Sequence, residues 1–166
     1  MGLLKCGCDE GLRYAAFMLR APQEVRTYLL TSVTANRRRL FQVEANAELF
    51  LSVLQAQREK SRMEIHAFVV MPDHVHVLLT PAVDVPLEKA AQFLKGGFSF
   101  QLKSKVDVWE RSYNQTQVLG AEKFAACREY VEMNPVRERM VFAPEEFRYS
   151  SASRVDMVDA VPMHLR

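Results

Sequence analysis

Two histidines separated by one residue, His74 and His76, are the side chains of this sequence best suited to bind a metal ion. They lie in an apolar segment, residues 74–80, that is typical of a β-strand. Because side chains alternate between the faces of a strand, both imidazoles are expected on one side and Val75 on the other. Two such imidazoles can bind one divalent ion if a third ligand comes from elsewhere, and the ion would polarise a phosphoryl oxygen.

A His-x-His pair also arises in strands by chance, so the pair alone leaves a purely structural role open. His66, in the preceding apolar segment, has no histidine two residues away and is interpreted as a structural or surface residue. Metal binding at the pair therefore needs support from other parts of the sequence.

Tyr130 is the candidate nucleophile, in a segment, residues 121–134, whose pattern predicts a helix. Asn134 lies four residues later on the same helix face, and its carboxamide oxygen is a ligand that Mg²⁺ or Mn²⁺ accepts. A phenol has a pKa of about 10, so it needs activation at neutral pH. Its attack on a phosphodiester would leave a reversible phosphotyrosine link, which suits cutting and rejoining. In isolation, a tyrosine at a helix edge is more often a packing residue.

The elements that must position these residues follow an alternating order. Helices interleaved with a strand pair predict an α+β fold, a ferredoxin-like antiparallel sheet with helices packed mainly on one face. The stretch 106–119 is compatible with a short strand or a loop. The expected strands are 25–34, 64–71 and 74–80, and the expected helices are 45–60, 87–105 and 121–134.

The length of 166 residues fits one domain with a sizeable core. Residues 1–24 are expected to form a loosely attached leader, residues 25–152 a catalytic domain, and residues 153–166 a C-terminal tail. The net charge of +2 does not by itself indicate a polyanionic partner, so any nucleic-acid contact must come from local charge clusters.

The cysteines Cys6, Cys8 and Cys127 are odd in number and form no C-x-x-C pair, which argues against a disulfide framework or a zinc site. A reducing, cytoplasmic location is the simplest expectation. No window approaches the roughly 20 apolar residues that a membrane span needs, so no membrane association is expected.

Taken together, the segments resemble a known family. Residues 68–81 (FVVMPDHVHVLLTP) and residues 128–137 (REYVEMNPVR) are similar, in order and spacing, to the REP-associated tyrosine transposases. These are relatives of the single-strand insertion-sequence transposases with a His-hydrophobic-His motif and one catalytic tyrosine. The resemblance spans roughly residues 25 to 152, and further matching segments are 36–41, 94–99, 109–111 and 147–151.

This resemblance implies a ferredoxin-like core, use of Mg²⁺ or Mn²⁺, and cleavage of single-stranded DNA beside short hairpins. It implies that His74 and His76 are metal ligands, that Tyr130 is the nucleophile, and that Asn134 is a further polar ligand. The hairpins of such relatives are repetitive extragenic palindromes, often in bacteria. The protein would then be cytoplasmic, nucleoid-associated when bound to DNA, and a monomer or homodimer.

Candidate DNA contacts come from basic residues around this core. The run Arg37, Arg38 and Arg39 follows the first expected strand, although such runs are often only solvated loops. Gly96 and Gly97 weaken the 87–105 helix, which is compatible with close approach of DNA or of a neighbouring helix. The remaining candidates are Lys95, Lys103 and Arg137.

The chain departs from the resembled pattern after Trp109, where the family usually has an aromatic pair and a histidine. Here residues 112–117 read SYNQTQ, so Thr116 replaces a histidine that could organise the site or hold DNA. Two alternatives remain besides a transposase-like enzyme. One is a domesticated protein that binds DNA hairpins without cutting, and the other is a metal-dependent phosphoesterase in which Tyr130 is structural.

Overall fold

The computed structural model describes residues 24–166, and its centre is a four-stranded antiparallel sheet. The strand order is β2-β3-β1-β4, which together with two intervening helices is the ferredoxin-like βαββαβ arrangement. The expected α+β class is therefore confirmed. The strands are β1 (Thr27–Val33), β2 (Met63–Val70), β3 (His74–Pro81) and β4 (Asn114–Val118).

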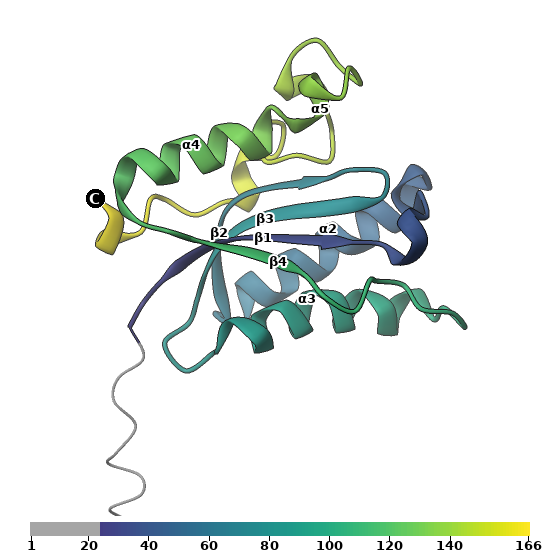
Figure 1. The fold of residues 1–166 in the computed structure, drawn as a ribbon, viewed down its shortest axis with the longest axis horizontal. Helices are drawn as coiled ribbons and strands as arrows, with labels where there is room; N and C mark the ends of the chain where they lie inside the picture. Colours follow the sequence, from purple (N-terminus) through teal and green to yellow (C-terminus); the bar gives the residue numbers. More distant parts are fainter. Residues whose placement is uncertain (1–23) are drawn as a thin grey trace, which may run out of the picture.

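Helices cover both faces of this sheet. Figure 1 shows α2 (Glu44–Glu59) and α3 (Leu87–Leu102) on one face, as expected, and α4 (Gly120–Glu132) across the other. The strands β2 and β3 are buried on both faces along most of their length, which requires a layer on each side. The structure thus adds a helix on the second face to the arrangement expected from sequence.

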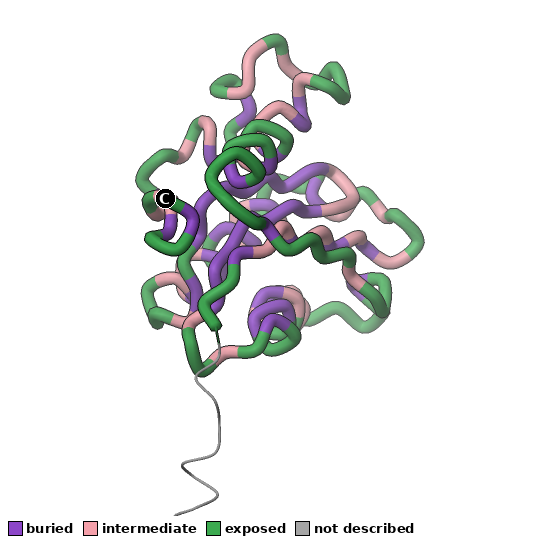
Figure 2. Tube along the Cα trace, turned by 60° about the vertical axis from the view of Figure 1, so that its left-hand side comes forward, coloured by how far each residue is buried: buried purple, intermediate pink, exposed green. Residues whose placement is uncertain are grey.

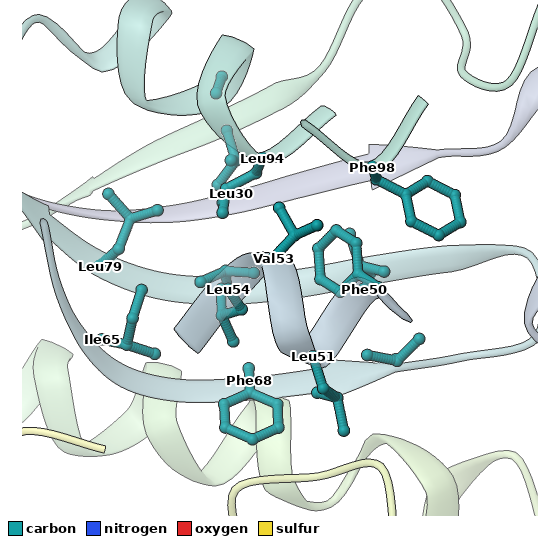
Figure 3. Close-up of a cluster of buried hydrophobic side chains, with 14 of the residues drawn as sticks. Leu30, Phe50, Leu51, Val53, Leu54, Ile65, Phe68, Leu79, Leu94 and Phe98 are labelled. Atoms are coloured by element: carbon teal, nitrogen blue, oxygen red, sulfur yellow. The ribbon is translucent and has the colours of Figure 1, made fainter. Parts of the chain in front are cut away.

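The larger core lies between the sheet and the helix pair α2 and α3. Figure 3 shows Phe50 and Val53 of α2 and Phe98 of α3 close to sheet residues such as Leu30 and Leu79. Trp109 is only 9% exposed, and its ring lies 5.6 Å from that of Phe98 between centroids. Both aromatic rings are therefore part of the core and are not available to stack on DNA bases.

Gly97 explains how closely α2 and α3 approach. A Cβ atom built on Gly97 would meet a methyl carbon of Val53 at 3.0 Å, whereas one on Gly96 would meet only Gln92 at 3.9 Å. Gly97 therefore serves the contact with the neighbouring helix, and Gly96 has room for a side chain.

The second core lies between the sheet and α4. Phe124, Cys127 and Val131 are buried on one side of α4 and pack on Leu78 and its neighbours on β2 and β3. His66 is fully buried on the same face, where its Nε2 lies 2.8 Å from the Thr80 hydroxyl. The interpretation of His66 as a structural residue agrees with this environment.

Several boundaries differ from the sequence expectations. The helix expected over 87–105 ends at Leu102, because Lys103 adopts a left-handed conformation with φ of 52°. The helix expected over 121–134 ends at Glu132, and the short helix α5 (Asn134–Arg137) follows it. The ambiguous stretch 106–119 contains β4 at the edge of the sheet.

Residues 153–166, set apart as a tail by the sequence, pack against the domain. Arg58 of α2 forms an ion pair with Asp159 at 2.9 Å, and Asp159 also accepts a hydrogen bond from the Ile65 amide. Leu165 is buried in the core under α4. Figure 2 shows buried positions concentrated along the sheet and the inward sides of the helices.

The expected leader, residues 1–24, lies outside the described residues except for Glu24, as do Cys6 and Cys8. Cys127 is a buried free thiol. Within residues 24–166, no helix combines the length and apolar character needed to cross a membrane.

Candidate active site

His74 and His76 lie on β3 and face α4. Strand alternation places them on the same side as Leu78, which packs in the α4 core, whereas Val75 and Val77 pack on the α2 and α3 side. The two imidazole centroids are 4.9 Å apart. The structure therefore brings the histidine pair together on the face of the sheet that carries α4.

Each imidazole is held by a hydrogen bond at Nδ1. His74 Nδ1 lies 2.7 Å from a carboxylate oxygen of Asp73, and His76 Nδ1 lies 2.7 Å from the Thr31 hydroxyl. A carboxylate accepts, so Nδ1 of His74 donates, and in the neutral form of that ring the lone pair is on Nε2. If Nδ1 of His76 also donates, both rings present Nε2 as a ligand atom, with their orientation fixed from behind.

The electrostatic environment favours a neutral His76 beside an ionised Asp73. Burial, together with the charge of the neighbouring His74, lowers the pKa of His76 to about 4. Partial burial raises the pKa of Asp73, but hydrogen bonds and charge from His74 and Arg37 outweigh it and lower that pKa overall. A histidine must be neutral to bind a metal ion, and the lowered pKa of His76 meets this need. The neighbouring His74 is oriented by the Asp73 carboxylate.

Tyr130 lies on α4 at the edge of its buried side, over the histidine pair. Its ring is 5.4 Å from that of His76 between centroids, in an edge-to-face arrangement. The residue is 39% exposed, so the phenol is not enclosed in apolar packing. The guanidinium of Arg137 lies 5.1 Å from the centroid of the Tyr130 ring. A phenol, two imidazoles and a guanidinium, far apart in the sequence, thus meet on one face of one chain.

Asn134 is placed at the start of α5, one turn beyond Tyr130, and is 7% exposed. Its carboxamide is in the same part of the fold, although no contact between it and the imidazoles is established. Over the described part of the chain, no three His, Cys, Asp or Glu side chains converge as a metal-binding group. A third ligand would therefore be an amide, a water molecule or a substrate oxygen.

The three arginines of the run 37–39 have different roles. Arg37 forms an exposed ion pair with Asp73 at 3.3 Å, which places it beside His74. Arg38 donates hydrogen bonds to the carbonyl oxygens of Ala35 and Asp107 and so holds its own loop. Arg39 is exposed and lines a hollow of about 460 Å³ together with Arg37 and His74.

Lys95 lies on α3 and Lys103 directly follows it, on the opposite face of the sheet from Tyr130. The Lys95 ammonium donates to the carbonyl oxygens of Glu110 and Ser112, and its partial burial lowers its pKa. Lys103 is exposed at the end of α3. The structure does not bring these two lysines to the histidine pair.

Asp73 and Thr31 are site residues that the sequence reasoning missed. Asp73 directly precedes His74, and an acidic neighbour of a candidate metal ligand was a readable signal. Thr31 meets His76 only because β1 pairs with β3 in a register that sets these two residues opposite each other. That register cannot be read from local sequence.

The model of the family described as "Transposase IS200 like" matches residues 24–134 of this chain. The chain belongs to the IS200-like transposase family. The matched region includes His74, His76 and Tyr130, and ends at Asn134. The protein is accordingly a transposase by family, a DNA-processing enzyme. Curated proteins include no match to this chain.

Solved structures share the fold. A REP-associated tyrosine transposase bound to a REP hairpin is 18% identical, with a TM-score of 0.70 over 86% of this chain and 90% of that chain. A putative transposase from Deinococcus radiodurans is 22% identical, with a TM-score of 0.49 over 68% of this chain and 93% of that chain. The first similarity supports the ferredoxin-like assignment.

Proposed function

We propose that this IS200-like transposase cuts and rejoins single-stranded DNA beside hairpins through a covalent link to Tyr130. The observation that carries the proposal is the meeting of the Tyr130 ring and the His76 ring at 5.4 Å on an accessible face. The two imidazoles, the phenol and the guanidinium of this proposal all come from the same chain.

The residues present suit a divalent ion, Mg²⁺ or Mn²⁺. His74 and His76 would hold it through Nε2, with Asn134 as a candidate third ligand from the turn after α4. The hydrogen bond that Nδ1 of His74 donates to the Asp73 carboxylate is the outer support that metal-binding histidines usually have. When bound, the ion would supply charge stabilisation to the phosphate that reacts.

Tyr130 would attack the phosphorus of a bound phosphodiester. The bond from the phenol oxygen to phosphorus forms, the bond from phosphorus to one sugar oxygen breaks, and the phenol proton ends on the released sugar hydroxyl. Because one phosphate ester replaces another, the sugar hydroxyl can attack in reverse and rejoin the strand. Arg137, next to the Tyr130 ring, is placed to pair with the phosphate.

A DNA hairpin is proposed as the substrate because the structurally similar REP-associated tyrosine transposase is described as bound to one. Arg37 and Arg39 line the hollow beside His74, where phosphates of the strand can bind. Thr116 lies on the exposed edge strand β4, paired with Leu29 of β1. Because Asp73 and Thr31 already hold the His74 and His76 rings, a histidine at position 116 is not needed to orient them.

Adduct formation tests the proposal. A pool of labelled stem-loop oligonucleotides with randomised single-stranded flanks is incubated with the protein and Mn²⁺, then resolved under denaturing conditions. The proposal expects a protein-linked label that disappears with EDTA and in Tyr130→Phe. Tyr149→Phe is the matched control and should retain the adduct, because that ring packs beside Phe147 and Arg148 instead.

The same assay separates the two alternatives. Hairpin retention without any adduct would identify a binding protein that does not cut. Cleavage that persists in Tyr130→Phe would identify a phosphoesterase with a different nucleophile.

A further inference from the structure

Phe142 is 97% exposed, the largest value among the large apolar side chains of the described residues. It lies in residues 138–146, here called the tip loop, which follows α5. Figure 1 shows α5 and this loop projecting beyond the end of α4. Phe142 belongs to neither hydrophobic core, so its ring is free to contact a partner.

The backbone of the tip loop is fixed by hydrogen bonds. A carboxylate oxygen of Glu146 accepts from the amides of Phe142 at 3.0 Å and Ala143 at 3.3 Å. The Met140 amide donates to the carbonyl oxygen of Pro135 at 2.9 Å. Phe142 is therefore presented from an ordered backbone, which reduces the entropy lost when the ring binds a partner.

Two hollows connect the tip loop with the active site. The first, of about 460 Å³, lies between His74 and Met140 and has Arg37 and Arg39 in its wall. The second, of about 410 Å³, lies on the other side of Met140 and is lined by Phe142 and its neighbours. Met140 lines both hollows, so they are neighbours, and together they extend from the His74 imidazole to Phe142; this stretch of surface is here called the path.

Three arginines and three acidic side chains line this path, so any phosphate contact on it comes from individual arginines and not from an excess of positive charge. Arg37 and Arg39 contribute to the first hollow and Arg139 to the second. Of the acidic side chains there, Asp73 is paired with Arg37, and Glu146 accepts from the loop amides. Glu138 is the remaining acid, at the edge of the first hollow. Arg39 and Arg139 can each bind a phosphate, and the exposed Phe142 ring can stack on a base, which is a combination that sites for single-stranded nucleic acid use.

We propose that Phe142 stacks on an unpaired base of single-stranded DNA that runs from His74 past Met140. This proposal rests on the proposed function, because it takes DNA as the substrate of the Tyr130 site. Phe142 acts as a positioning residue: stacking at the end of the path fixes which phosphate of the strand lies at Tyr130. Stacking tolerates any base, so Phe142 sets spacing and not sequence.

A base-stacking probe tests this without any cleavage. Stem-loop oligonucleotides with oligo-dT flanks, each with 2-aminopurine at one flank position, are titrated with the Tyr130→Phe protein. We expect fluorescence quenching at one or two adjacent positions, its loss in Tyr130→Phe/Phe142→Ala, and its retention in Tyr130→Phe/Phe142→Trp. The alanine variant should bind the flank about 5- to 100-fold more weakly.

Phe100 provides a matched control. It is 83% exposed but lies on α3, across the sheet from the path, so Phe100→Ala should leave quenching and affinity unchanged. Because both phenylalanines are exposed, neither alanine variant should lose stability.

Three outcomes would overturn the proposal: quenching that persists in Phe142→Ala, an equal loss in Phe100→Ala, or Phe142-dependent self-association in sedimentation without an effect on DNA. A Phe142→Ala protein that retains the Tyr130 adduct and its cleavage positions, with unchanged quenching, would remove the inference and leave the proposed function intact. Phe142-dependent quenching in a protein that never forms an adduct would remove the proposed function and leave the stacking of Phe142 on DNA intact.

Discussion

Replacement of Asp73 by asparagine should weaken Mn²⁺ binding without disturbing the fold. The carboxylate of Asp73 lies 2.7 Å from Nδ1 of His74, and its own backbone carbonyl accepts hydrogen bonds from the amide and hydroxyl of Thr34. Asparagine keeps the backbone contacts and the shape of the side chain. It removes the negative charge that makes the His74 ring a better ligand.

The size of the effect follows from how well this pair is shielded. The side chains of Asp73 and His74 are 23% and 19% exposed, so water screens their interaction only in part. Loss of such an outer partner typically costs 10- to 100-fold in metal affinity. We expect the Mn²⁺ affinity to fall about tenfold in Asp73→Asn, which keeps an acceptor oxygen. In Asp73→Ala it should fall by about 100-fold. These factors correspond to about 1.4 and about 2.8 kcal/mol.

Isothermal titration with Mn²⁺ measures the affinity directly, and the dependence of adduct yield on Mn²⁺ concentration measures it through the reaction. Asp84→Asn is the control, because Asp84 is an exposed acid in the turn between β3 and α3. Equal Mn²⁺ affinities of Asp73→Asn, Asp84→Asn and the unmodified protein would refute the assignment of Asp73 as the support of a metal ligand.

Further predictions concern stability. In urea unfolding, Gly96→Ala should stabilise α3 by up to about 1 kcal/mol, whereas Gly97→Ala should be less stable than Gly96→Ala because its Cβ would crowd Val53; a more stable Gly97→Ala would contradict this close approach. Phe124→Ala should lower the free energy of unfolding by about 3 to 5 kcal/mol and reduce adduct formation, because Phe124 holds α4 on the sheet; unchanged stability would contradict that packing. Burial lowers the pKa of His66, so protonation favours the unfolded state, and stability should decline as the pH falls below the usual value of 6.5 towards the lowered one. The decline between pH 7.5 and 5.5 should be smaller in His66→Gln, and an equal decline would exclude His66 as a source.

The strands and helices that carry the candidate site were predictable because their local patterns are strong. The apolar runs around Pro72 and Asp73 predicted β2 and β3, and alternation within β3 predicted that His74 and His76 share a side. Helical spacing in residues 121–134 predicted that Tyr130 lies at the edge of a buried side, in agreement with its 39% exposure.

Features that depend on distant pairing were not predictable from local patterns. The contact of Thr31 with His76 requires the order and register of β1 and β3. The attachment of residues 153–166 depends on the ion pair of Arg58 with Asp159, which are 101 residues apart. The position of α4 on the second face had a partial signal, since both alternating sets of side chains in β2 are apolar except for Glu64 and His66.

The central claim is that the imidazoles of His74 and His76 and the phenol of Tyr130 serve one metal-dependent reaction centre. Anomalous scattering from a crystal soaked in Mn²⁺ locates the ion directly. The account predicts an ion bound to Nε2 of both histidines, on the side of the sheet that faces Tyr130. An ion bound elsewhere, with both Nε2 atoms free of metal in the same crystal, would contradict it.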